Sequence, residues 1–252
     1  MLLRSRLVNS AVAFALACLV MITLHELAHA AVALLQGNSP TLGAFSVDPH
    51  ATTDGERIAT ALGGPLFSLV SGVVVLTLPT SRLPAFWGLA VLWFGLLSVQ
   101  EFSGYLITGP FAGVGDIGQA LELSNAPAYV GWIGFVVGWA ITYVVGRIAV
   151  RRLITFTDSD TALAPQLREL GLFAWLTGVV IVLILSLGLF DGGGDGPFEA
   201  LGLIASGIFL IFVRLFMTEG MRSSGAPVRF GVPAVGMVAL IVVALARQIL
   251  FR

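Results

Sequence analysis

Residues 7–36 read LVNSAVAFALACLVMITLHELAHAAVALLQ, an apolar run whose few strongly polar side chains gather near its far end. A helix that crosses a membrane needs roughly 20 mostly apolar residues, and this run is long enough. The apolar pattern continues through residues 31–35, so we expect this span to be retained rather than removed as a signal peptide at Ala28-His29-Ala30.

The composition of the whole chain agrees with a membrane protein. Of its 252 residues, 57% are hydrophobic and only 11% are charged. Soluble domains carry about 25% charged residues, so a soluble enzyme is excluded. The formal net charge of −1 and the absence of a basic stripe also exclude nucleic-acid binding. The sequence therefore predicts an all-α polytopic membrane protein.

Pro, Gly and charged clusters divide the chain into about seven transmembrane helices. We expect these spans at 7–36, 58–78, 84–108, 128–147, 169–190, 198–217 and 231–250. The third span can also continue past Gly109-Pro110 to about Ser124. The 37–57 loop is either a plain surface loop or holds a short strand or hairpin, because residues 38–48 partly alternate. We expect a multi-pass integral protein of a prokaryotic cell membrane.

The predicted spans distribute the arginines unevenly between the two sides of the membrane. If the start of the first span is cytoplasmic, ten of the 13 basic residues fall inside, which satisfies the positive-inside rule. The inner residues are Arg4, Arg6, Arg82, Arg147, Arg151, Arg152, Arg168, Arg214, Arg222 and Arg229, and the outer ones are Arg57, Arg247 and Arg252.

The first span contains the motif His25-Glu26-Leu27-Ala28-His29. Histidines at i and i+4 lie on one face of a helix, where both imidazoles can bind one metal ion. A glutamate directly after the first ligand can reach a metal-bound water, as in zinc hydrolases. The alternatives are a helix end whose polar groups simply meet water, or a polar contact between helices.

A catalytic zinc ion usually has three protein ligands, so a third ligand is required. The candidates are His50, Asp54, Glu101 and Asp116. Asp116 follows a helix-breaking run of Gly and Pro and lies on the same side of the membrane as the two histidines, so we favour it. It can instead be the N-cap of a short helix. His50 is the second choice.

Two polar residues of the third span, Gln100 and Glu101, are also candidates for the site. Together with His50, they are candidates to hydrogen-bond the ligands or to contact substrate. The alternative for Gln100 and Glu101 is an ordinary hydrogen bond between two helices.

On these residues the chain resembles the site-2 protease class of intramembrane zinc metalloproteases. The resemblance covers about residues 8–125 and rests on three segments: His25 to Ala30 with Gly37, Ala61-Leu62-Gly63-Gly64-Pro65-Leu66, and Asp116 to Leu121. Ile117 replaces the expected Gly, the usual Asn before the Pro is missing, and there is no PDZ-like insertion. That class generally runs the metal helix in the opposite direction to the one that the arginines favour.

The resemblance implies a Zn²⁺ ion held by His25, His29 and Asp116, with Glu26 as the catalytic base. It implies a metalloprotease-like core over residues 1–127, additional membrane helices over 128–252, and a substrate that is a transmembrane segment of another protein in the lipid bilayer. Two other functions fit the sequence less well: a transporter with an intramembrane polar site, and a protease homologue that binds membrane proteins without cutting them.

Overall fold

The computed structural model describes residues 2–43, 45–113, 115–159, 162–189, 205–218, 220–223, 228 and 230–251. Five helical segments in this part of the chain are long and apolar enough to cross a membrane. They contain, in order, α1 (Leu2–Leu35), α2 (Asp54–Thr77), α3 (Ala85–Ala112), α5 (Ala128–Leu153), and α6 (Leu163–Leu167) joined through a π-helical turn (Arg168–Phe173) to α7 (Ala174–Leu189). These five segments match the first five predicted spans, as expected of an integral membrane protein.

The last two predicted spans are not confirmed as membrane helices. Residues 234–250 form α10 (Ala234–Leu250), which is apolar but has only 17 residues. Of the predicted span 198–217, residues 198–204 lie outside the described part of the chain. The remainder contains a 3-10 helix at Ile208–Phe212 and the single turn α9 (Val213–Phe216), not one continuous α-helix.

Short-range signals set the ends of the helices around the site. Thr53 and Glu56 form a reciprocal capping box that starts α2. The third span does not break at Gly109-Pro110, because α3 continues to Ala112 and ends at Gly113, whose φ of 60° is left-handed. A separate short helix, α4 (Gly115–Leu123), follows directly and carries Asp116 in its first turn.

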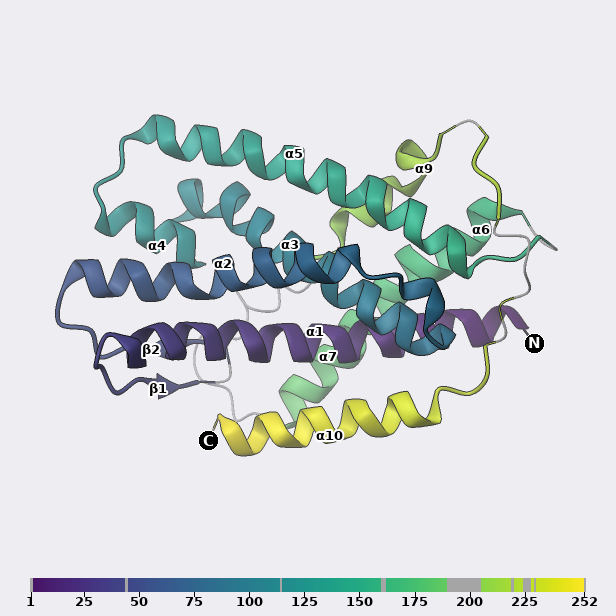
Figure 1. Ribbon diagram of the computed structural model, residues 1–252, viewed down its shortest axis with the longest axis horizontal. Coiled ribbons are helices and arrows are strands. Elements are labelled where there is room, and N and C mark those ends of the chain that lie inside the picture. The colour runs from purple at the N-terminus through teal and green to yellow at the C-terminus, as the bar shows by residue number, and fades with distance from the viewer. Residues whose placement is uncertain are drawn as a thin grey trace.

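Helix α1 lies at the centre of the bundle and packs against α2, α3, α7 and α10 (Figure 1). Between residues 11 and 19 every side chain of α1 is buried, and four of these are alanine, whose small size permits close approach of the neighbouring helices. Trp93 of α3 fills the space beside Phe14, with a ring-centroid distance of 5.2 Å. Its indole N–H donates to the Ser10 hydroxyl at 3.0 Å.

The connection between α1 and α2 forms a small antiparallel hairpin of β1 (Thr41–Leu42) and β2 (Val47–Asp48). The hairpin that was one of two alternatives for the 37–57 loop is therefore present. The hairpin lies at the end of the bundle where α1 ends and α2 begins, and α4 lies at the same end (Figure 1).

We expect Trp93→Ala to destabilise the protein by about 3–5 kcal/mol, because the change leaves a cavity against Phe14 and removes the indole N–H that donates to Ser10. Trp93 is fully buried, whereas Trp132 is 59% exposed on the outer face of α5. Trp132→Ala is therefore the matched control, and thermal unfolding in detergent measures both. Equal loss of stability in the two variants would contradict the packing described for α1 and α3.

Candidate metal centre

The two histidines of the motif lie in the last third of α1 and are oriented by α2. His25 and His29 are 3% and 5% exposed, so their imidazoles do not simply meet water at a helix end. The Nδ1 atom of His25 lies 3.0 Å from the Ser68 hydroxyl, and Nδ1 of His29 lies 2.7 Å from the Thr60 carbonyl oxygen. A carbonyl only accepts hydrogen bonds, so His29 Nδ1 donates, and its Nε2 atom faces His25 and Asp116.

Asp116, in the first turn of α4, joins the two imidazoles at their Nε2 atoms. Its Oδ2 atom lies 3.0 Å from His25 Nε2 and 3.2 Å from His29 Nε2, and the two Nε2 atoms are 3.0 Å apart. Ligand atoms bonded to one tetrahedral zinc ion at 2.0–2.1 Å would be about 3.3 Å from one another. The three donors therefore form a triangle of nearly the right size, and their chemistry suits zinc.

The carboxylate of Asp116 is electrostatically matched to its neighbours. Burial by itself would raise the pKa of Asp116, but the hydrogen bonds and charges of His25 and His29 outweigh burial and hold that pKa well below its usual value. The carboxylate thus faces the two imidazoles in its ionised form, which suits a candidate metal ligand.

Gly64 of α2 leaves room for these ligand atoms. A Cβ atom built on Gly64 would lie 2.3 Å from His29 Nε2 and 2.6 Å from His25 Nε2, both closer than any ordinary contact. Only glycine lets the backbone of α2 pass so near the imidazoles. The Gly63-Gly64-Pro65 segment therefore has a direct structural role beside the candidate ligands.

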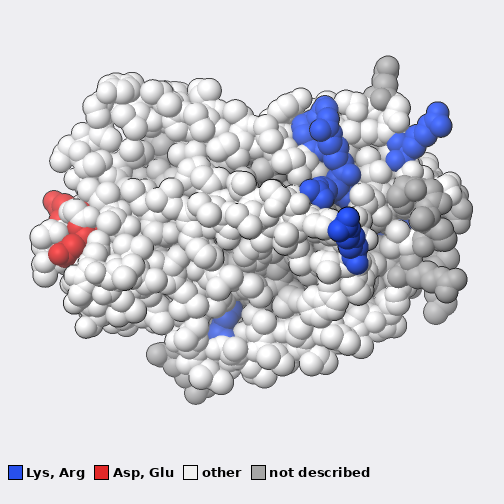
Figure 2. Space-filling model, in the orientation of Figure 1, with Lys and Arg blue, Asp and Glu red and all other residues white. Residues whose placement is uncertain are grey.

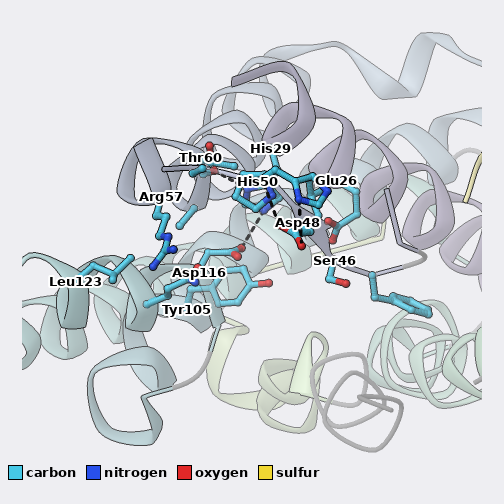
Figure 3. Close-up of a pocket in the computed structure, with 16 residues that line it drawn as sticks. Glu26, His29, Ser46, Asp48, His50, Arg57, Thr60, Tyr105, Asp116 and Leu123 are labelled. Carbon is cyan, nitrogen blue, oxygen red and sulfur yellow. Dashed lines mark hydrogen bonds and ion pairs between the residues drawn. The ribbon is translucent and has the colours of Figure 1, made fainter. Parts of the chain in front are cut away.

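Glu26 borders a cavity of about 650 Å³ next to the histidines (Figure 3). Its side chain is 6% exposed, and its Oε2 atom has no hydrogen-bond partner among the described residues. A carboxylate buried without such a partner is costly unless the site uses it. The cavity is lined by Glu26 and His29 of α1, residues 45–51 of the hairpin, Arg57, Thr60 and Ala61 of α2, Tyr105 of α3, and Asp116, Gln119 and Leu123 of α4.

The other sequence candidates do not join the ligand triangle. His50 lines the rim of the cavity, where its Nε2 atom bonds the Thr41 hydroxyl at 2.8 Å. The Asp54 side chain is 68% exposed at the start of α2. Gln100 donates to the Thr142 hydroxyl of α5 at 3.3 Å, which is the ordinary contact between helices that was its alternative. Neither Gln100 nor Glu101 is among the residues that line the cavity.

Two residues near the site were not among the candidates taken from the sequence. Tyr105 of α3 stacks its ring on His25, with 5.8 Å between centroids and 26° between planes, and it borders the cavity. Nothing in the sequence marks Tyr105 except that it follows Glu101 by one helical turn.

The second residue is Arg247, which is 1% exposed in the last turn of α10. It donates to the Thr23 hydroxyl at 2.6 Å, two residues before His25. Its guanidinium also lies over the rings of Phe45 in the hairpin and of Phe251, at 5.4 and 4.9 Å. An arginine inside an apolar predicted span is the signal that points to such a role.

Comparison with known proteins finds no family model, no characterised protein and no solved structure that matches this chain. The resemblance to the site-2 protease class therefore stays a prediction, and the site rests on its own geometry.

We expect Gly64→Ala to abolish metal binding, because the added methyl group occupies the space of both Nε2 atoms. Gly104→Ala is the control, since nothing lies within 4 Å of a Cβ built on Gly104 in the same bundle. Elemental analysis measures the zinc content of both variants, and the melting temperature shows whether each is folded. Full zinc binding by a folded Gly64→Ala protein would contradict the close approach of α2.

We expect Arg247→Met to loosen the hairpin without destabilising the bundle. Loss of a desolvated cation–π contact of about 1–2 kcal/mol corresponds to roughly 5- to 30-fold faster amide exchange in residues 41–48. Thr23 keeps its hydrogen bond to the Leu19 carbonyl when Arg247 is replaced, so we expect the bundle to stay folded. Hydrogen–deuterium exchange measures the effect, with the half-exposed Arg57 changed to Met as control. Unchanged exchange in the Arg247 variant would refute the anchoring contact.

Proposed function

We propose that this protein is an intramembrane zinc endopeptidase that hydrolyses peptide bonds in the transmembrane or membrane-proximal segments of membrane proteins. One observation supports it above all: three donors suited to zinc meet at one point, and a buried carboxylate without a hydrogen-bond partner in the described chain borders the adjoining cavity. A purely structural polar cluster would have no need to leave that carboxylate unsatisfied.

In this proposal His25, His29 and Asp116 hold the ion. Zinc bound there would make a water molecule acidic and polarise the carbonyl of the bond to be cut. Glu26 takes the proton of the attacking water on its free Oε2 atom and later delivers it to the leaving amine. Ser68 and Thr60 hold the two imidazoles so that both Nε2 atoms face Asp116.

The hairpin is the natural place for the substrate. A helical segment hides its peptide bonds, so it must be extended before it can be cut. Residues 45–51 form one continuous wall of the cavity, and a two-stranded hairpin leaves strand edges to which an extended peptide can add. The cavity volume of about 650 Å³ is in the range of known ligand sites.

The proposal includes a multi-pass topology in a prokaryotic cell membrane. Seven spans would require that α10 and residues 198–217 also cross the bilayer, in addition to the five long helical segments. Fusion of reporter domains to the connecting loops would count the crossings.

We expect about one zinc ion per chain in detergent-purified protein, retained in Glu26→Gln and His50→Ala but lost in Asp116→Ala. Because Glu26 moves the proton without holding the metal, Glu26→Gln should lower cleavage of a membrane-protein substrate by a factor of about 10² to 10⁴. Elemental analysis and a gel-based cleavage assay measure the two properties separately.

Retained cleavage by Glu26→Gln would rule out the mechanism. No zinc in the metal-replete wild-type protein would rule out the metalloprotease and favour a transporter or a binding protein.

A further inference from the structure

Basic side chains gather at the end of the bundle where α1 begins. The guanidinium of Arg152, near the end of α5, donates to the Leu76 carbonyl at 2.7 Å and so ties that end to the end of α2. Arg6 of α1 pairs with Asp158 and Glu169, which follow α5 and α6. Six of the described arginine side chains at this end are Arg6, Arg82, Arg147, Arg151, Arg152 and Arg168.

The opposite end, which holds the candidate metal centre, is acidic. Asp48 of the hairpin, Asp54 and Glu56 of α2, and Glu122 of α4 all lie there. Within the described part of this end, Arg57 is the exposed basic residue. Figure 2 shows the same division on one face: blue side chains cluster toward the start of α1, and red ones lie at the far edge where α2 begins.

This distribution fixes the direction of the helices in a membrane. Arginines in short connections stay on the cytoplasmic side, and anionic lipids of the inner leaflet attract each by about 1 kcal/mol. Two carboxylates at the arginine end are already paired with Arg6, so they do not cancel the exposed charge. Turning the protein over would place six arginines on the outer side.

The depth of the site follows from the same helix. His25 comes 20 residues after Ser5, the first residue of the long apolar segment of α1. At a rise of about 1.5 Å per residue, this is about 30 Å, which equals the thickness of the hydrocarbon core. The ligands therefore lie near the boundary farther from the arginines, and the hairpin lies beyond them.

We infer that the arginine end lies in the cytoplasm and that the candidate metal centre opens to the extracytoplasmic side. The direction does not depend on any enzyme activity. The consequence for substrates rests on the proposed function. If the protein is a protease, it cuts peptide bonds of membrane proteins at the extracytoplasmic boundary of the bilayer. This is the reverse of the direction implied by the resemblance to the site-2 protease class.

Single-cysteine labelling of the full chain in living bacterial cells tests the direction. The native Cys18 is buried and is first replaced by alanine. Ser39→Cys and Ser124→Cys then mark the site end, and Ser81→Cys marks the arginine end, all at exposed positions. A membrane-impermeant maleimide should label the first two variants in intact spheroplasts, and the third only after the membrane is opened.

Labelling of Ser81→Cys in intact spheroplasts, alone or with the other two, would overturn the inference. The substrate consequence is tested with two single-span reporters that carry the same cleavable segment at the outer or the inner boundary. Selective cleavage of the outer reporter supports the consequence, and selective cleavage of the inner one refutes it. If labelling is as expected but neither reporter is cut, only the proposed protease function fails.

Discussion

The rest of the structure depends on how two imidazoles of a membrane helix find hydrogen-bond partners. Lipid offers no hydrogen-bond partner, so polar groups of His25 and His29 must find theirs within the protein. Both Nδ1 atoms find them on α2, at Ser68 and at the Thr60 carbonyl. This requirement sets the register of α2 against α1 and requires a glycine at position 64, where the backbone of α2 passes close to both Nε2 atoms. With the Nδ1 atoms occupied, both Nε2 atoms point toward Asp116.

The parts of this arrangement that follow from local sequence were predictable. Hydropathy identified the five long helices because each needs only its own composition to cross a membrane. The spacing of His25 and His29 predicted that both lie on one face of their helix. The helix-breaking run before Asp116 favoured Asp116 over His50 as the third candidate ligand. The structure brings these three together.

The parts that depend on contacts between distant helices were not predictable. Arg247 lies far from Thr23 in the chain, and no pattern in the sequence states which helix its guanidinium meets. Tyr105 could equally have faced lipid. Residues 208–216 read as part of an apolar span, yet hydropathy does not distinguish an α-helix from the 3-10 turn and short helix found there. The second half of the chain thus contacts the site through Arg247, although no site residue was predicted in that half from the sequence.

The hairpin has a consequence for how this architecture can diversify. Its ladder contains two residue pairs, and one short connection between α1 and α2 supplies seven consecutive residues of the cavity wall. Surface connections accept substitutions and insertions far more readily than packed helices do. Related chains can therefore acquire new selectivity by changing residues 45–51 alone, while the buried histidines and the glycine beside them stay fixed. Divergence among such relatives should be concentrated in this one segment.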